Sequence, residues 1–282
     1  MRQKEKLMNP WIIVGLVLVA IIVLLVVFYF VMMKPGAKRG GLEKYSGVKF
    51  AHRGLHGDTV PENSLSAFKL AVDGGYGIEL DVHAAKDGVA VVFHDGTLVR
   101  MTGKDARLGD FTSAELSEIK LIGSEEKIPT FREVLDLVDG RVPLLVELKQ
   151  DGEEVGVAKA AAELLSDYKG DFIVESFNPF TLADFAREMP EVRRGILSQN
   201  FMKNPKHRTF KHFLVQNLLL NRVCKPDFVA FNHADADFFP FKLIKAVYKP
   251  VTVAWTVRSK EEENAAYKNG FDSVIFENYI PE

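Results

Sequence analysis

The sequence has little cysteine and little net charge. Its 282 residues include a single cysteine, Cys224, so no disulfide can form within the chain and nothing depends on an oxidising compartment. The 36 lysines and arginines nearly balance the 38 aspartates and glutamates, which gives a formal net charge of −2. Nothing in this balance favours nucleic acid as a partner. The chain also lacks convincing internal repeats and low-complexity segments.

Apolar residues are unevenly distributed along the chain. Residues 11–33 form an unbroken apolar run without a charge. As a helix that rises about 1.5 Å per residue, this run is long enough to cross a hydrocarbon core of roughly 30 Å. A secretory signal peptide would have a shorter apolar region followed by a small-x-small cleavage site, and the end of this run has neither. We therefore expect one transmembrane helix over residues 11–33, after a short basic tail over residues 1–10.

Positive charges flank this run almost equally, with three basic residues before it and four in the segment after it. The positive-inside rule needs a bias between the flanks. The sequence therefore predicts a single-pass protein of the cell membrane and leaves the side of the soluble part open. Residues 34–44, with Pro35 and several glycines, are predicted to form a flexible linker. The remaining residues, 45–282, are close in number to the roughly 250 that are typical of a (β/α)8 barrel.

Short β-branched or aromatic segments alternate with helical segments through the soluble part. The predicted strands are Val48–Ala51, Gly77–His83, Val89–His94, Pro143–Lys149, Phe172–Ser176, Arg193–Ser198, Phe228–Asn232, Val251–Val257 and Ser273–Phe276. The predicted helices include Ser64–Val72, Phe131–Val138, Val155–Tyr168, Leu182–Glu188 and Glu261–Lys268. This alternation indicates βαβ units and a parallel sheet. Eight such units would close a (β/α)8 TIM barrel.

One of the nine predicted strands does not fit a parallel barrel. Only five residues separate His83 from Val89, whereas a parallel crossover needs a dozen or more. Asp87-Gly88 favours a two-residue hairpin turn. We therefore expect a β-hairpin excursion after the second strand, in which the third strand runs back antiparallel. With that turn, His94 would lie opposite Asp81.

Ionisable side chains gather at the predicted strand ends. Glu79 and Asp81 alternate on one strand, and Glu147 and Lys149 alternate on another, so each pair shares a face. The apolar residues at the alternating positions would face the helix layer. The acids then face the barrel interior, where unpaired carboxylates are costly. Oxygen ligands of this kind favour Mg²⁺ or Ca²⁺ over softer metals. We therefore expect a divalent cation as cofactor.

Two histidines and an arginine complete the predicted cluster. His52 and Arg53 follow the first strand, and His94 ends the hairpin. Histidine has a pKa near neutrality, which suits a general acid or base. Arg53 can bind a phosphate bidentately, and Lys149 is a second cation suited to a phosphate. Because the C-terminal ends of barrel strands form the mouth that holds active sites, the pattern predicts that these groups converge there.

The ordered set of motifs resembles the glycerophosphodiester phosphodiesterase family. In chain order the motifs are His52-Arg53-Gly54, Pro61-Glu62-Asn63-Ser64, Glu79-Leu80-Asp81-Val82, Lys86-Asp87-Gly88, Val92-Phe93-His94-Asp95, Pro129-Thr130-Phe131, Glu147-Leu148-Lys149, Ser176-Phe177 and Trp255-Thr256-Val257. The resemblance spans nearly all of residues 48–280. It implies a (β/α)8 barrel that hydrolyses glycerophosphodiesters, small-molecule substrates, to glycerol 3-phosphate and an alcohol with the help of a divalent cation.

The resemblance also implies roles for individual residues. By position, His52 and His94 would be the acid–base pair in either order, Glu79, Asp81 and Glu147 the metal ligands, Arg53 and Lys149 the phosphate contacts, and Trp255 a wall of the substrate pocket. Supporting residues would be Glu62, which would orient Arg53 or His52, and Asn63. Either Asn63 or Ser64 suits a helix N-cap.

Two positions depart from the family pattern. Phe276-Glu277 stands where the last strand often ends in Thr-Asp, and Arg258 stands where asparagine is frequent. We expect these departures to affect the choice of substrate rather than the reaction. The head group of the substrate, the choice between Mg²⁺ and Ca²⁺ and the oligomeric state are not predicted.

Two other functions compete with hydrolysis. A cyclising lyase of the phospholipase type also uses two histidines on a barrel, although the complete Glu62-Asn63 and Glu147-Leu148-Lys149 motifs argue against it. A membrane-tethered, non-catalytic sensor of phosphodiesters or lipid headgroups would be expected to have lost a metal carboxylate or a histidine, and none is missing. The basic stretch from Phe201 to Val223 is interpreted as an ordinary amphipathic barrel helix. Its alternative is a surface that contacts anionic headgroups.

Overall fold

A computed structural model describes residues 9–36, 40–150 and 156–282. Its helices are α1 Pro10–Met33, α2 Leu65–Asp73, α3 Val99–Thr102, α4 Ser113–Leu116, α5 Phe131–Val138, α6 Val157–Leu165, α7 Pro179–Glu188, α8 Phe210–Gln216, α9 Asn221–Cys224, α10 Phe239–Tyr248 and α11 Lys260–Lys268. Its strands are β1 Lys49–Ala51, β2 Gly77–Ala84, β3 Ala90–Val92, β4 Leu144–Leu148, β5 Phe172–Ser176, β6 Arg194–Ser198, β7 Phe228–Asn232, β8 Val251–Val257 and β9 Ser273–Phe276. Short 3₁₀ turns include η1 Glu43–Tyr45 and η3 Phe201–Lys203.

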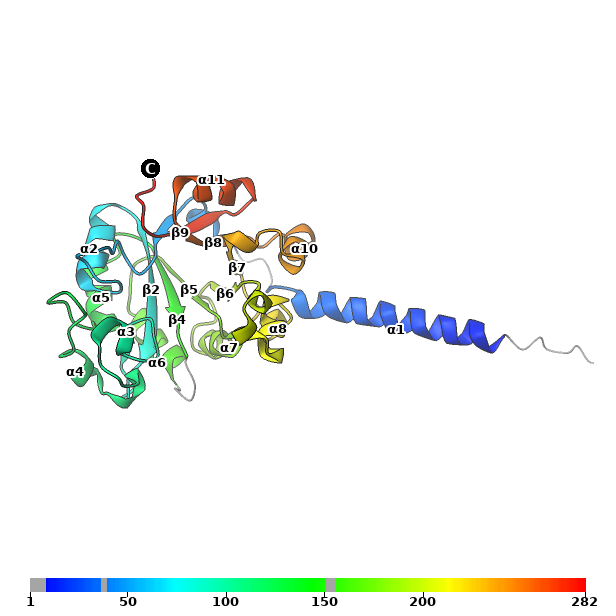
Figure 1. Cartoon of the computed structure of the whole chain (residues 1–282), viewed down its shortest axis with the longest axis horizontal. Coiled ribbons are helices and arrows are strands. Elements are labelled where there is room, and N and C mark those ends of the chain that lie inside the picture. Colours follow the sequence, from blue (N-terminus) through cyan, green and yellow to red (C-terminus); the bar gives the residue numbers. More distant parts are fainter. Residues whose placement is uncertain (1–8, 37–39, 151–155) are drawn as a thin grey trace, which may run out of the picture.

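Among the described residues, eight parallel strands close into a barrel, with helices packed around it (Figure 1). The strand order is β1-β9-β8-β7-β6-β5-β4-β2, and β1 pairs with β2 to close the ring. Strand β3 pairs antiparallel with β2 outside the ring. The predicted TIM barrel with a hairpin excursion is therefore confirmed. The nine strands lie within two residues of their predicted bounds, while the predicted helix start at Val155 lies outside the described residues.

The register of the hairpin differs by one residue from the prediction. The pairing of β2 with β3 brings Phe93, not His94, opposite Asp81, and the Phe93 N–H donates to the Asp81 carbonyl at 3.0 Å. The cause is the loop, which has three residues, 86–88, rather than two. Gly88 lies in the left-handed region with φ 79°, as three-residue hairpin loops require. The sequence argument for an Asp81–His94 pair in the ladder was therefore wrong.

Alternation along the strands separates two apolar layers. Inside the barrel, Phe50, Leu145 and Phe228 belong to one buried cluster. Outside it, residues such as Leu80 and Val146 pack with the surrounding helices in a larger cluster. Because Glu79 and Asp81 alternate with that outer set, they point into the barrel, as the two-residue period predicts.

The chain between β2 and α5 forms a small unit of its own beside the barrel. Its buried apolar residues include Val91, Phe93, Leu98 and Leu108, which form a third cluster. The unit contains β3 and the short helices α3 and α4. The excursion is therefore larger than a simple hairpin, and it carries His94 to one side of the barrel mouth.

Helix α1 leaves the barrel as a long, isolated rod (Figure 1). It is long and apolar enough to cross a membrane, a property that signal sequences near an N-terminus share. Its last turn is attached to the barrel, since Met33 is fully buried and its carbonyl accepts from the Asn221 side chain of α9 at 2.8 Å. The Tyr248 hydroxyl of α10 donates to the Phe30 carbonyl at 2.8 Å. Within the predicted linker, residues 37–39 lie outside the described residues.

Candidate active site

Three buried carboxylates lie together at the mouth of the barrel. Glu79 and Asp81 come from β2 and Glu147 from β4, and the pairing of these strands brings Asp81 directly beside Glu147. One oxygen from each of the three lies within 4.8 Å of the others, and none of the three side chains is more than slightly exposed. Such a set of oxygens could hold a metal ion. The sequence predicted this set, and the structure brings it together.

The three carboxylates differ in how easily they lose a proton. Burial and the neighbouring carboxylates raise the pKa of Glu79 well above its ordinary range. Burial also raises the pKa of Glu147 to about 7, although Lys149 opposes the shift. Burial alone would raise the pKa of Asp81 as well, but Lys149, His94, Arg53 and Asn63 together hold it well below its ordinary range. Asp81 is therefore the permanent negative charge of the cluster.

Lys149 lies between two of the carboxylates. Its Nζ is 3.2 Å from Oδ1 of Asp81 and 3.0 Å from Oε2 of Glu147. Burial would lower the pKa of Lys149, but these two acids more than offset that effect, so the pKa is raised and the ammonium stays charged. On the other side, the Asn63 amide donates to Oδ2 of Asp81 at 2.8 Å. The α2 N-cap is Ser64, whose hydroxyl accepts from the Ala67 N–H.

A tight turn after β1 places Arg53 over the cluster. Arg53 and Gly54 both adopt left-handed backbone conformations, with φ 55° and 81°. A Cβ atom on Gly54 would lie 2.8 Å from the backbone of Ala67, so only glycine fits at this position. The turn aims the Arg53 N–H at Oε2 of Glu79, at 2.9 Å, and its guanidinium Nη1 lies 2.8 Å from Oε1 of Glu62.

The two predicted catalytic histidines line the same cavity, which has a volume of about 230 Å³. Burial lowers the pKa of His52 and also that of His94, so both rings favour the neutral form. Each ring has a carboxylate at Nδ1: Asp95 lies 2.5 Å from His94, and Glu277 lies 3.4 Å from His52. The two Nε2 atoms are thus the ring nitrogens left for a substrate, and that of His52 lies 4.0 Å from Glu79.

An ion-pair network that the sequence did not predict joins the two sides of the mouth. Arg100, on α3 of the excursion unit, donates from Nε to Asp95 at 2.6 Å. Its Nη2 donates to Oε1 of Glu62 at 2.7 Å, and Glu62 in turn holds Arg53. Arg100 lies 38 residues from Glu62 in the sequence, and no local spacing signals that the two meet.

Glu175 is a further cavity residue that the sequence analysis missed. It lies on β5 beside Glu147, is 1% exposed, and its Oε2 has no hydrogen-bond partner among the described residues. Burial and Glu147 raise its pKa well above the ordinary range. Its signal in the sequence was weak, because Glu175 is a single acid in an otherwise apolar strand segment and only the strand pairing places it level with Glu147.

Aromatic rings form one wall of the cavity. Trp255 of β8 meets Phe177 edge to face, with ring centroids 5.4 Å apart. The indole Nε1 of Trp255 is buried without a hydrogen-bond partner among the described residues, so it can donate to a ligand oxygen. Both rings line the cavity that contains the histidines.

The two departures from the family pattern contact each other. Nη2 of Arg258 lies 2.8 Å from Oε2 of Glu277, whose other oxygen lies near His52 and 3.3 Å from Nε2 of His56. Glu277 therefore keeps a carboxylate beside His52. His52, His56 and Glu277 also form a second group that could hold a metal ion, but Arg258 already neutralises its only acid.

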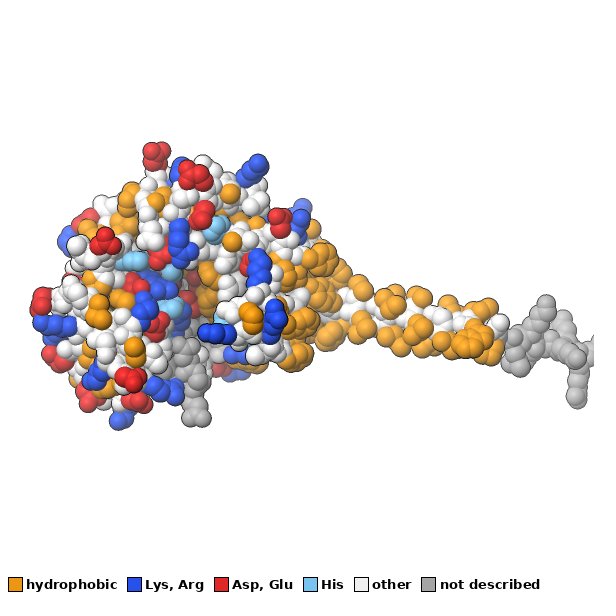
Figure 2. All heavy atoms as spheres, in the orientation of Figure 1, with side chains coloured by type: hydrophobic (Ala, Val, Ile, Leu, Met, Phe, Trp, Pro, Cys, Tyr) orange, Lys and Arg blue, Asp and Glu red, His pale blue; other side chains and the backbone are white. Residues whose placement is uncertain are grey.

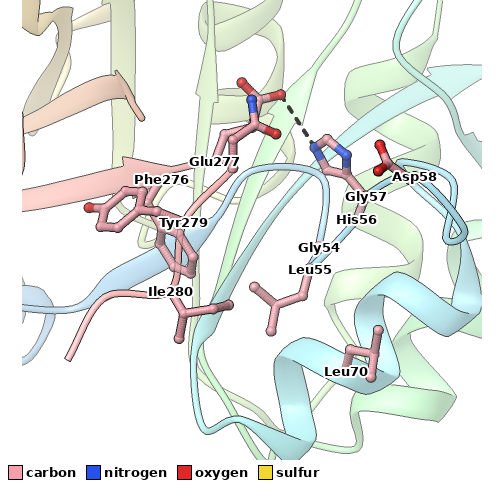
Figure 3. Close-up of a pocket in the computed structure, with 11 residues that line it drawn as sticks. Gly54, Leu55, His56, Gly57, Asp58, Leu70, Phe276, Glu277, Tyr279 and Ile280 are labelled. Carbon is pink, nitrogen blue, oxygen red and sulfur yellow. Dashed lines mark ion pairs between the residues drawn. The ribbon is translucent and has the colours of Figure 1, made fainter. Parts of the chain in front are cut away.

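A larger cavity, of about 540 Å³, has Glu277 in its lining (Figure 3). Figure 3 shows His56 paired with Glu277 on one side, and Leu55, Tyr279 and Ile280 on the other. The carboxylate trio does not line this cavity. The smaller cavity, lined by both histidines and by Glu79 and Glu147 of the trio, is therefore the candidate active site.

Comparison with known proteins decides the family. The sequence model of the glycerophosphoryl diester phosphodiesterase family matches residues 52–280. This chain belongs to that family. It is an enzyme, a phosphoric diester hydrolase, as the sequence predicted.

Individual relatives agree with this family assignment. The chain is 32% identical to a glycerophosphodiester phosphodiesterase of Caldanaerobacter subterraneus over 80% of its own length and 91% of that protein. Among solved structures it is similar to an Oleispira antarctica phosphodiesterase in complex with sn-glycerol-3-phosphate, at 25% identity and a TM-score of 0.69, covering 83% and 94% of the two chains. A Thermotoga maritima glycerophosphodiester phosphodiesterase matches at 25% identity and a TM-score of 0.61, covering 82% and 94%.

Proposed function

We propose that this family member hydrolyses glycerophosphodiesters to glycerol 3-phosphate and an alcohol, with a divalent cation and from a position anchored in a membrane by α1. One observation carries the proposal: three buried carboxylates lie together, and two of them, Glu79 and Glu147, line one cavity with two histidines that each have a carboxylate near Nδ1. The product bound to the Oleispira antarctica relative supports the predicted product. The length and composition of α1 support the anchor.

The carboxylate trio fits a hard cation. Its donors are all oxygen, as Mg²⁺ and Ca²⁺ prefer. Oδ1 of Asp81 is buried and accepts no hydrogen bond among the described residues, because Lys149 approaches it as an ion pair without hydrogen-bond geometry. A cation held by Glu79, Asp81 and Glu147 would polarise the phosphoryl oxygens of the substrate.

His52 and His94 would share the proton transfers. One ring takes the proton of the nucleophilic hydroxyl or water, and the other gives a proton to the leaving alkoxide. Their neutral forms, favoured by burial, suit the base, while Asp95 and Glu277 would stabilise an imidazolium once it forms. Either ring can take either role, because each has a carboxylate near Nδ1: Asp95 is hydrogen-bonded to His94, and Glu277 lies 3.4 Å from His52.

The remaining cavity residues would bind and orient the substrate. Arg53 and Lys149 would contact the phosphate, and the free indole N–H of Trp255 would donate to a substrate oxygen. Glu62 would orient Arg53, which it contacts directly, and Asn63 would hold Asp81 in place. Glu62 thus acts through Arg53, which lines the cavity, and Asn63 acts through Asp81, which belongs to the carboxylate trio.

The full-length protein in detergent provides the test. It would be incubated with glycerophosphocholine, glycerophosphoethanolamine and glycerophosphoglycerol, and products followed by ³¹P NMR. We expect glycerol 3-phosphate, loss of the reaction in EDTA and its recovery with Mg²⁺ or Ca²⁺. His207→Ala, a change outside the cavity, serves as the control for His52→Ala and His94→Ala. Release of glycerol 3-phosphate that survives EDTA would overturn the metal requirement. A stable cyclic phosphate would identify the lyase, and binding without turnover would identify the sensor.

A further inference from the structure

Exposed hydrophobic side chains gather where α1 leaves the barrel (Figure 2). In the described barrel domain, three of the four exposed phenylalanines belong to α8 and α10: Phe210, Phe213 and Phe239. Phe210 is 75% exposed and Phe239 is 69% exposed. Exposed Val223 of α9 and Val247 of α10 lie in the same part of the chain. We call the exposed side chains of residues 206–249 the α8–α10 surface.

The α8–α10 surface is also strongly basic. Residues 201–250 contain nine lysines and arginines, three aspartates and no glutamate, so they carry +6 in a chain whose total is −2. Seven of these basic residues between 206 and 249 are exposed, against one exposed acid, Asp237. The rest of the chain is net acidic. Within the barrel domain, residues 201–250 are therefore attracted to an anionic lipid layer, whereas the rest of the domain, taken together, is net acidic and is repelled by it.

The attachment of α1 fixes the level of this surface relative to a bilayer. Trp11 and Tyr29 lie near the two ends of the helix, about 27 Å apart at a rise of about 1.5 Å per residue. That span matches a hydrocarbon core of about 30 Å, and Trp and Tyr favour the two interfaces. The neighbour of Tyr29, Phe30, accepts the hydrogen bond from Tyr248 at the end of α10. The end of α10 therefore lies at the headgroup level, and α9, bonded to Met33, lies beside it.

We infer that the α8–α10 surface rests on the headgroup layer of the leaflet from which α1 emerges, with Phe210 and Phe239 among the lipids and the basic side chains on anionic headgroups. The inference rests on the membrane anchor of the proposed function. It replaces the interpretation of residues 201–223 as an ordinary barrel helix. Exposed aromatic rings combined with lysine and arginine are the composition of segments that lie in a membrane interface.

The surface ends beside the active site. His212 of α8 packs on Phe201 of η3 with ring centroids 5.0 Å apart, and Phe201 packs on Phe177 at 6.0 Å. Phe177 is the ring that meets Trp255 in the cavity wall. When the α8–α10 surface contacts the membrane, the active-site cavity therefore lies close to the lipid headgroups.

Depth measurements on the full-length protein in vesicles test the inference. Single cysteines, Phe210→Cys and Phe239→Cys, would carry the environment-sensitive NBD fluorophore in vesicles of phosphatidylcholine and phosphatidylglycerol. Leu70→Cys on α2, at the end of the barrel opposite α1 (Figure 1), is the matched control. The wild-type chain, whose only thiol is the buried Cys224, gives the background labelling. We expect doxyl lipids to quench NBD at 210 and 239, and aqueous iodide to quench it at 70. Equal iodide quenching at all three positions would overturn the inference.

A second arm tests the role of charge. Lys206→Glu, Arg208→Glu and Lys211→Glu would be combined in the Phe239→Cys chain. The control combines Lys120→Glu, Lys127→Glu and Lys159→Glu, which change the same charge elsewhere on the exposed surface. We expect phosphatidylglycerol to increase the shielding of position 239 from iodide severalfold in the control and much less in the α8 variant. The same dependence on phosphatidylglycerol in both chains would overturn the electrostatic part.

Failure of this inference differs from failure of the proposed function. A protein that carbonate washes off the vesicles lacks the anchor, whatever the fluorophores report. A protein that stays in the vesicles but exposes positions 210 and 239 to iodide has the membrane anchor, but its α8–α10 surface does not contact the headgroup layer. Neither residue lines the cavity, so both cysteine variants are expected to hydrolyse glycerophosphocholine in detergent at the wild-type rate.

Discussion

Replacing Glu147 by glutamine should stabilise the metal-free protein and abolish its stabilisation by metal. The pKa of Glu147 is raised from an ordinary 4.5 to about 7 by burial. Because folding raises this pKa, Glu147 makes a contribution to the free energy of unfolding that is fully present below pH 4.5. This contribution is lost as the pH rises through 7. A shift of this size corresponds to about 3 kcal/mol at 1.36 kcal/mol per pKa unit. Glutamine has nearly the same shape and cannot ionise, so the variant avoids that loss.

Thermal unfolding of the full-length protein in detergent measures this effect. In EDTA at pH 8, Glu147→Gln should melt roughly 6–12 °C above the wild type, because about 2–4 °C corresponds to 1 kcal/mol in a domain of this size. At pH 4.5 the difference should vanish. Mg²⁺ or Ca²⁺ should raise the melting temperature of the wild type and not that of the variant. Glu163→Gln, at an exposed glutamate of α6, is the control. Equal pH dependence of wild type and variant, or equal stabilisation of both by metal, would refute the reasoning.

Three further predictions concern catalysis and the barrel. His52→Ala and His94→Ala should each lower kcat by about 10²–10⁴, the usual contribution of a general acid or base, with an unchanged circular dichroism spectrum; a near-normal rate would remove that histidine from the pair. Arg53→Lys keeps the charge but loses the planar fork that binds a phosphate bidentately, so KM should rise, and steady-state kinetics showing an unchanged KM would contradict a phosphate contact. Gly195→Ala would place a Cβ atom 2.1 Å from the Phe228 ring inside the barrel. Overpacking of this kind costs about 1–3 kcal/mol or more, and a urea midpoint equal to that of the wild type would show that the ring has room to move.

The sequence predicted the barrel well because its strands are short, separated and apolar with a clear period. The direction of Glu79 and Asp81 into the barrel followed from the apolar residues that alternate with them, and the outer cluster around Leu80 confirms that step. The hairpin was predicted from spacing, but its register depended on whether Gly88 ended a two-residue or a three-residue loop. Asp-Gly is compatible with both, so the pattern alone could not decide.

The parts of the site that escaped prediction depend on contacts between distant segments. Arg100 meets Glu62 only because the excursion unit folds back over the turn after β1. Glu175 is a single acid in an apolar strand, without the two-residue repeat that drew attention to Glu79 and Asp81. Its importance becomes visible only when the strand pairing sets it beside Glu147.

The ammonium of Lys149 has a consequence for how the protein is made. Because this group already lies between Asp81 and Glu147, the barrel carries an internal counterion for its acidic centre. The chain can thus fold around that centre before it meets a metal ion, and the ion can be loaded afterwards through the open mouth. We therefore expect newly synthesised enzyme to accumulate as a folded, inactive apoprotein when divalent cations are scarce, and to become active on their return without a cycle of unfolding.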